Sequence, residues 1–369
     1  MNNFQQFFRE NSDVDAFLVT EKENIFYLTG FRGSFGYLLV LKSGESFLIT
    51  DSRYAEVAKN LNFLAYLSGG MKVEFVLFDK NFPRKIKDIL NKTLVNHSLS
   101  EGEFTVAIEN SAKLSQKEYW QEIFAGKKLV SQDKIIEKWR SVKNANELQK
   151  VREACLQLDK VFADKDFFRE ILREGVTERE VAFQLEMKLR DFGKYKLSFP
   201  VIVAFGENSA VPHHKPGNRQ LKFRENILID CGVKFENYCS DMTRNFFLSS
   251  PSSDYLEKFE ILLNAQENTL QKFQIGQKLL ATQEFCKQEL GNFAEFFTHS
   301  LGHGVGLDIH ELPSFSEKEQ AIFTTGQVVT CEPGIYFPRK FGIRIEDQVL
   351  ITKDGPEILT KTPKELMIL

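Results

Sequence analysis

Residues 227–247 read ILIDCGVKFENYCSDMTRNFF, in which two apolar runs are separated by a short polar stretch. This pattern is typical of a β-hairpin. The first run ends in Asp230, and Asp241 enters the second run. If the turn lies at 234–237, Asp230 sits directly opposite Asp241, with Cβ atoms about 5 Å apart. Two carboxylates at this distance repel each other, so a cation between them is the economical explanation.

A second hairpin is predicted on either side of Pro338-Arg-Lys340. This turn places Glu332 opposite Glu346, so carboxylates again face carboxylates. Side chains alternate along a strand, which puts Arg344 on the face of Glu346 and the isoleucines beside it on the other face. Each hairpin alone is equally consistent with an ordinary polar face whose acids are solvated.

The segment between the hairpins, residues 300–311, reads SLGHGVGLDIHE and places His303 among three glycines. Glycine lets the backbone approach a buried centre closely. A lone histidine is more often a satisfied core residue than a ligand, but here histidines cluster with the acids. Five of the six histidines lie in one part of the chain, namely His213, His214, His299, His303 and His310.

Carboxylates with one imidazole form a donor set that suits paired Mn, Fe, Co or Zn ions, whereas a structural zinc site favours several thiolates. Two such ions about 3.5 to 4 Å apart can share a water, lower its pKa towards neutrality and polarise a carbonyl. The sequence therefore predicts amide hydrolysis at two divalent metal ions. The expected metal ligands are Asp230, Asp241, His303, Glu332 and Glu346.

The chain has 369 residues, more than a single core usually supports, so two domains are expected. Strand-like runs at 16–19, 37–41 and 46–50 alternate with turn-formers or polar helical stretches, which predicts an α/β domain over residues 1–130. A long charged helical segment then opens the second domain, residues 131–369. A faint internal duplication within it predicts two similar halves that place their carboxylates around one axis.

Composition narrows the class of protein. Against 51 acidic residues there are 48 basic ones, a formal net charge of -3 that leaves no basic excess for a general nucleic-acid role. We read no secretory signal at the N-terminus and no apolar run long enough to span a bilayer, so a cytoplasmic protein is expected. The odd count of five cysteines fits reduced thiols, and Cys231 and Cys239 are interpreted as buried inert thiols rather than ligands of a soft metal.

Residues 200–347 resemble the pita-bread metallopeptidases, a family that includes methionine aminopeptidase, aminopeptidase P, prolidase and the non-peptidase creatinase. The resemblance lies in Ile-Asp-Cys-Gly with Asp230, Ser-Asp-Met-Thr-Arg with Asp241, Ser-Leu-Gly-His-Gly-Val-Gly with His303, Cys-Glu-Pro-Gly-Ile-Tyr with Glu332, and Gly-Ile-Arg-Ile-Glu-Asp with Glu346. It implies an α+β pita-bread catalytic domain. Residues 13–60 also resemble the family's α/β N-terminal domain of the creatinase/prolidase type, which ordinary methionine aminopeptidases lack.

The resemblance implies a role for each ligand. Asp230 would chelate one metal, His303 and Glu332 would hold the other, and Asp241 with Glu346 would bridge both. Manganese is the expected metal, with cobalt, zinc and iron as alternatives.

Substrate roles follow from the same resemblance. Glu332 would accept a proton, His310 would contact the substrate carbonyl, and His213 would assist proton transfer or orient the scissile bond. Arg344 would bind a substrate or product carboxylate.

The implied activity is hydrolysis of the Xaa-Pro bond at the N-terminus of small proline-containing peptides, by a homodimer of the aminopeptidase P or prolidase type. Pro212-His-His214 departs from the Pro-His-Gly usual in prolidase-like members and lies nearer aminopeptidase P. The alternatives are a hydrolase of the creatinase or methionine aminopeptidase type, and an inactive pita-bread module that binds peptides. Intact metal ligands disfavour the inactive module.

Overall fold

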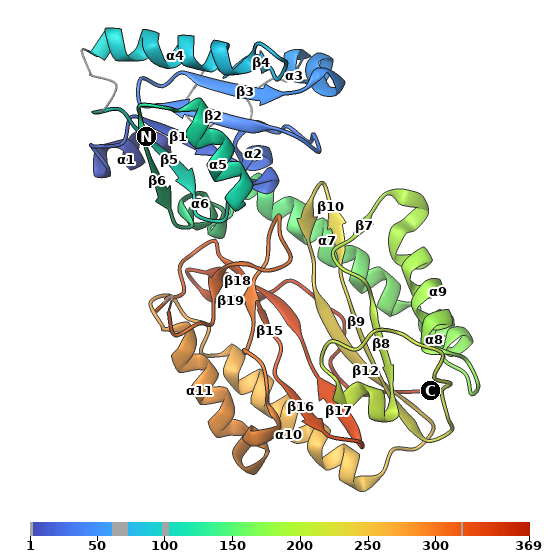
Figure 1. The fold of residues 1–369 in the computed structure, drawn as a ribbon. Helices are drawn as coiled ribbons and strands as arrows, with labels where there is room; N and C mark the ends of the chain where they lie inside the picture. The colour runs from blue at the N-terminus through green and yellow to red at the C-terminus, as the bar shows by residue number, and fades with distance from the viewer. Residues whose placement is uncertain (1–2, 61–72, 98–102, 319) are drawn as a thin grey trace. The chain divides into compact units, whose positions relative to one another are not determined.

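The computed structural model describes residues 3–60, 73–97, 103–318 and 320–369. The chain divides into two compact units, Met1–Trp139 and Arg140–Leu369. Figure 1 shows the helices and strands of each unit. Each unit has its own apolar cores.

Within the described residues, the N-terminal unit contains a six-stranded sheet of order β4-β3-β2-β1-β5-β6. Its strands are β1 (Ala16–Val19), β2 (Tyr37–Leu41), β3 (Ser46–Thr50), β4 (Val73–Leu77), β5 (Thr105–Glu109) and β6 (Lys128–Gln132). Its helices are α1 (Asn3–Glu10), α2 (Lys22–Thr29), α3 (Ala55–Asn60), α4 (Phe82–His97) and α5 (Leu114–Ile123), and α6 (Ile135–Ser141) runs across the division.

Both faces of this sheet are buried. Alternate residues of β1 enter two different cores, with Ala16 and Leu18 in one and Phe17 and Val19 in the other. Sheets covered on both faces have strands that read as continuous apolar runs, and this explains why the first three strands could be predicted with their bounds. The α/β class predicted for this part of the chain is confirmed.

The division between the units lies later than the boundary predicted near residue 130. Strand β6 pairs in parallel with β5, so residues as far as Gln132 belong to the N-terminal sheet. Ile136 is buried in the same unit, and Trp139 packs against its core. The change to a polar helical pattern therefore precedes the structural division.

The C-terminal unit has two halves of similar construction. In the first half, α7 (Ala145–Ala163), α8 (Lys165–Ile171) and α9 (Glu178–Arg190) share a core with β8 (Ile202–Phe205), β9 (Glu225–Cys231) and β12 (Met242–Leu248). In the second half, α10 (Ser253–Leu270) and α11 (Leu279–Leu290) share a core with β15 (Val328–Cys331), β16 (Gly334–Phe337) and β18 (Asp347–Thr352) (Figure 1). This supports the predicted duplication.

The remaining strands complete the sheets of this unit. In its described part the sheet orders are β20-β12-β9-β8, β14-β13-β15-β18-β19, β11-β10-β7 and β16-β17. The added strands are β7 (Lys196–Leu197), β10 (Val233–Phe235), β11 (Tyr238–Cys239), β13 (His303–Gly304), β14 (Glu311–Ser314), β17 (Phe341–Arg344), β19 (Gly355–Ile358) and β20 (Met367–Ile368).

The register predicted for the first hairpin is wrong. The turn consists of Glu236 and Asn237, whose φ values of 45° and 75° are those of a two-residue hairpin turn. This turn pairs Asp230 with Thr243, so Asp241 is a diagonal neighbour of Asp230 and does not lie opposite it. The observed partner of Asp230 is therefore two residues away from the predicted one. Because side chains alternate along a strand, a shift of two residues leaves both aspartates on one face.

The second hairpin has the predicted register. Gly334 pairs with Arg344 on one side and Cys331 pairs with Asp347 on the other, so Glu332 and Glu346 occupy facing positions between the two ladders. The isoleucines on either side of Arg344 lie in the apolar core, as strand alternation predicts.

All five cysteines are buried free thiols, as the composition indicated. Among the helices of the described residues, none has both the length and the apolar composition needed to cross a bilayer.

Candidate active site and metal centre

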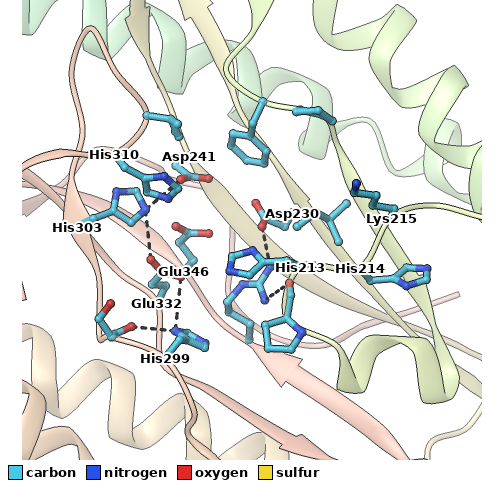
Figure 2. Close-up of a pocket in the computed structure, with 17 residues that line it drawn as sticks. His213, His214, Lys215, Asp230, Asp241, His299, His303, His310, Glu332 and Glu346 are labelled. Carbon is cyan, nitrogen blue, oxygen red and sulfur yellow. Dashed lines mark hydrogen bonds and ion pairs between the residues drawn. The ribbon is translucent and has the colours of Figure 1, made fainter. Parts of the chain in front are cut away.

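A cavity of about 410 Å³ lies in the C-terminal unit, and Figure 2 shows its lining. It brings together every site residue predicted from the sequence, namely Asp230, Asp241, His303, Glu332, Glu346, His213, His310 and Arg344. Further polar side chains line it at His214, Lys215, His299 and Ser300, and an apolar wall is formed by Phe199, Pro200, Ile202, Pro212 and Ile309.

The strand ends of both halves supply the five predicted ligands. In the first half, Asp230 lies near the end of β9 and Asp241 directly precedes β12. In the second half, His303 begins β13, while Glu332 follows β15 and Glu346 precedes β18. The duplicated architecture therefore directs carboxylates from two sheets into one cavity.

The closest grouping of possible metal ligands is Asp241, His303 and Glu346, whose ligand atoms all lie within 4.8 Å of one another. Nε2 of His303 is 3.6 Å from Oδ2 of Asp241 and 3.3 Å from Oε1 of Glu332. Nδ1 of His303 lies 3.1 Å from the carbonyl oxygen of Gly304. With the proton on Nδ1, the Nε2 lone pair faces the carboxylates, which is the usual arrangement of a metal-ligating histidine.

The acids of this site resist being ionised together unless positive charge lies among them. Burial, reinforced by the neighbouring carboxylates, raises the pKa of Asp241 and of Glu346 well above their ordinary values. Burial also raises the pKa of Glu332 to about 8. Among the described residues, Oδ1 of Asp230 and Oδ1 of Asp241 are buried without a hydrogen-bond partner. Divalent cations would offset the repulsion and satisfy these oxygens, so the residues fit a dinuclear site.

Two threonines orient the carboxylates. Thr243 donates to Oε2 of Glu346 over 2.7 Å. Thr330 donates to Oε1 of Glu332 over 3.1 Å and accepts the backbone N–H of His303. The sequence prediction missed both residues. Both could have been found from the sequence, because Thr243 lies two positions after Asp241 and Thr330 two positions before Glu332. Residues two apart on a strand share a face.

Arg344 makes its contacts inside the site. Its Nη2 donates to Oδ2 of Asp230 over 2.6 Å, and Nε donates to Oγ1 of Thr243 over 3.0 Å. Its Nη1 donates to Oη of Tyr336 and to the carbonyl oxygen of Pro212. Binding of a peptide carboxylate by Arg344 stays a prediction, and these hydrogen bonds compete with it.

Besides His303, four of the described histidines line the cavity, namely His213, His214, His299 and His310. The rings of His310 and His303 lie 4.2 Å apart at 79°, and burial lowers the pKa of His310. Burial lowers the pKa of His299 to about 4, and Nε2 of this residue lies 2.8 Å from Oη of Tyr336. Figure 2 shows His213 beside Asp230, whereas Asp241, Glu332 and Glu346 are nearer His303. His299 was noted from the sequence only as one of the clustered histidines.

His214 lies at the edge of the same cavity and binds Glu178, a residue that the sequence prediction missed. Nε2 of His214 is 2.8 Å from Oε2 of Glu178. The fully buried Glu178 carboxylate also accepts the backbone N–H groups of Phe205 and Gly217. Glu178 therefore holds the loop that carries His213.

Comparison with known proteins agrees with this geometry. Residues 149–353 match metallopeptidase family M24, and residues 1–142 match the creatinase/prolidase N-terminal domain. An uncharacterized peptidase of Staphylococcus haemolyticus is 32% identical over 362 residues, which cover 96% of this chain and 97% of that protein.

Solved structures of similar fold match this chain over nearly its full length. An Xaa-Pro dipeptidase from Bacillus anthracis is 29% identical with a TM-score of 0.86, covering 99% of this chain and 98% of that one. A prolidase from Pyrococcus horikoshii is 31% identical with a TM-score of 0.85, covering 99% of both chains. An X-Pro aminopeptidase from Thermotoga maritima is 32% identical with a TM-score of 0.82, covering 99% of this chain and 98% of that one.

The predicted combination of an α/β N-terminal domain with a pita-bread catalytic domain is thereby confirmed. Since the family match covers more than half of the chain, the protein belongs to metallopeptidase family M24 and carries an N-terminal domain of the creatinase/prolidase type.

Proposed function

We propose that this protein is a metal-dependent Xaa-Pro exopeptidase, which hydrolyses the bond between an N-terminal residue and a following proline. The observation that carries the proposal is the single cavity that unites four acids and His303 with His213 and His310. The names of the Bacillus dipeptidase, the Pyrococcus prolidase and the Thermotoga aminopeptidase support proline specificity for this chain.

The metal centre is assigned to Asp230, Asp241, His303, Glu332 and Glu346. When bound, a pair of divalent ions supplies Lewis acidity and lowers the pKa of water towards neutrality. The set combines oxygen ligands with one imidazole, and such sites select their metal by availability as much as by affinity. Manganese is our proposed physiological metal.

Side chains of this protein orient the peptide and transfer the proton of the attacking water. Glu332, held by Thr330, accepts a proton from the water that attacks the scissile carbonyl and returns it to the prolyl nitrogen as the C–N bond breaks. Burial lowers the pKa of His310, so its neutral ring is available to donate a hydrogen bond to the oxyanion as it forms. His213, which lies beside Asp230 in the cavity (Figure 2), orients the scissile bond.

The apolar wall of the cavity suits a proline-containing substrate. Phe199, Ile202 and Pro212 are among the apolar residues that line the cavity. They offer an apolar surface to a pyrrolidine ring and limit the access of bulk water. A cavity of about 410 Å³ matches a small peptide.

A substrate panel tests this function. We expect the manganese-loaded protein to cleave Ala-Pro or Ala-Pro-Ala and to leave Ala-Ala intact. Preference for the tripeptide would assign the aminopeptidase P type, and cleavage confined to the dipeptide would assign the prolidase type. Turnover of Met-Ala-Ser or creatine without turnover of the proline peptides would refute the proposal in favour of the alternative hydrolases. The cytoplasmic location and the homodimer stay predictions.

A further inference from the structure

A buried ion cluster lies beside the segment that carries both His303 and His310. It joins Glu311 to Arg140 and Lys143, two residues at the beginning of the C-terminal unit. The side chains of Arg140, Lys143 and Glu311 are 3%, 1% and 2% exposed, so all three charges are removed from water. None of the three lines the cavity, and the mechanism above does not use them.

The two oxygens of the Glu311 carboxylate bind two different cationic side chains. Nη2 of Arg140 donates to Oε2 over 2.6 Å, and Nζ of Lys143 donates to Oε1 over 2.7 Å. Arg140 also binds the half-exposed Asp308 over 2.7 Å, so two cations face two anions. Burial opposes ionisation of Glu311, but the charges of Lys143 and Arg140 hold its pKa below the ordinary value.

Stability alone does not account for such a cluster. Removing charges from water costs several kcal/mol for each ion, and well-packed apolar side chains of similar volume are often equally stable or more stable. An ion cluster also fixes the orientation of its side chains, because each carboxylate oxygen accepts a hydrogen bond from a particular donor. The question is therefore which part of the chain these hydrogen bonds fix.

The anchored part is the segment between His303 and Glu311. The backbone of Glu311 pairs with Gly304, which pairs in turn with Val329 of β15. The other end of the cluster is tied to the same region, because the backbone N–H of Lys143 donates to the carbonyl oxygen of Gly326 over 2.8 Å. Arg140 and Lys143 therefore fix the direction of Glu311 relative to β15.

Gly306 makes this anchoring possible. A Cβ at this position would lie 2.1 Å from Oε1 of Glu311. The loop backbone therefore passes directly over the carboxylate, and His310 precedes Glu311 at the end of that loop. His310 directly precedes Glu311, the first residue of β14, and lines the cavity, so the backbone position of His310 depends on where the cluster holds Glu311.

We propose that Arg140, Lys143 and Glu311 are positioning residues, which act through the backbone to hold His310 against His303 at the metal centre. This inference rests on the proposed function, in which His310 contacts the scissile carbonyl. The ring separation of 4.2 Å is the geometry that the cluster maintains. A catalytic group displaced by about 1 Å can lose roughly 100-fold in rate.

A double-mutant cycle tests the proposal. Lys143→Met, His310→Ala and the double variant are compared with the parent by kcat and KM for Ala-Pro, with manganese content and melting temperature as checks. We expect Lys143→Met to lower kcat roughly 10- to 100-fold with little change in KM. In the His310→Ala background Lys143→Met is expected to change kcat less than about twofold, because the histidine whose position Lys143 controls is absent.

Matched variants separate positioning from general damage. Lys188→Met breaks an ion pair of similar length, 2.8 Å, between half-exposed side chains outside the cavity, and kcat should be unchanged. Glu311→Gln preserves shape without charge and should reproduce the loss of kcat. Lys143→Arg should recover part of the loss by restoring the cation.

Equal losses of kcat from Lys143→Met in the presence and in the absence of His310 would overturn the proposal, as would an unchanged kcat in both Lys143→Met and Glu311→Gln. An independent reading comes from histidine ring NMR of the metal-free protein. The His310 resonance, identified by its loss in His310→Ala, should shift in Glu311→Gln while that of His214 stays fixed. An unmoved His310 resonance would reject the cluster's role even if the peptide specificity proposed above proved wrong.

Discussion

Thr243 links the two halves of the site through a single hydroxyl. It donates to Oε2 of Glu346 and accepts from Nε of Arg344, which in turn holds Asp230. One side chain on β12 thus orients acids that come from two different sheets. Partners of metal ligands commonly contribute 10- to 100-fold to metal affinity or activity.

Replacement of Thr243 by valine tests this link. Thr243→Val keeps the volume but removes both hydrogen bonds, so we expect kcat for Ala-Pro to fall roughly tenfold and manganese to bind more weakly. Steady-state kinetics and metal titration measure the two effects. Thr269→Val, at a buried threonine on α10 outside the cavity, is the matched control and should leave both unchanged. Parental kinetics in Thr243→Val would show that the hydroxyl has no orienting role.

At the scale of residues, the side chains that cluster in the cavity could be predicted from the sequence, because carboxylates and imidazoles are common metal ligands. The five proposed ligands all line it. Glu178 and the buried ion cluster were missed because their partners are distant in sequence. Glu178 binds His214 and Glu311 binds Arg140, and nothing in either local stretch reveals the partner.

At the scale of elements, the two hairpins show what a turn determines. The second was predicted in register because Pro338-Arg-Lys340 breaks its apolar runs. The pairing of the first hairpin was predicted wrongly because a four-residue turn was assumed at 234–237. The turn in the structure consists of Glu236 and Asn237. Register follows the turn type, which single residues decide.

The positive φ of Asn237, 75°, makes a prediction about this turn. Glycine adopts such a conformation freely, whereas a β-branched residue resists it by about 1–2 kcal/mol. Asn237→Gly should therefore leave the free energy of unfolding near that of the parent, and Asn237→Val should lower it by about that amount. Urea unfolding of the C-terminal unit measures the difference. Equal stabilities of the two variants would contradict the assigned turn.

At the scale of the whole molecule, the two units can be followed separately. The chain has two tryptophans, Trp120 and Trp139, and both lie in the N-terminal unit. Trp120 is fully buried in this unit, so a Trp139→Phe background lets tryptophan fluorescence report the unfolding of this unit. The unit contains a buried acid, Glu109, whose carboxylate accepts hydrogen bonds from Thr20, Glu21 and Asn24 at the start of α2.

Glu109 predicts how the stability of the N-terminal unit depends on pH. Burial raises its pKa from 4.5 to about 7, against the opposing effect of its hydrogen bonds. The folded state therefore holds this proton more tightly than the unfolded state. The resulting stabilisation is complete below pH 4.5 and is lost as the pH rises through about 7, a decrease of roughly 3 kcal/mol.

Urea unfolding followed by tryptophan fluorescence at pH 5 and pH 8 measures this decrease. Glu109→Gln cannot ionise and should show a smaller fall between the two values. The same fall in parent and variant would assign the pH dependence to other groups.

The central claim is that the acids and His303 form one dinuclear hydrolytic centre, and manganese titration of metal-stripped protein during hydrolysis of Ala-Pro tests it most directly. We predict that hydrolysis is absent in the stripped protein, rises with added manganese and saturates at about two ions per chain, whereas Asp241→Ala, though folded, stays inactive. Undiminished hydrolysis by the stripped protein, or by Asp241→Ala, would contradict the account.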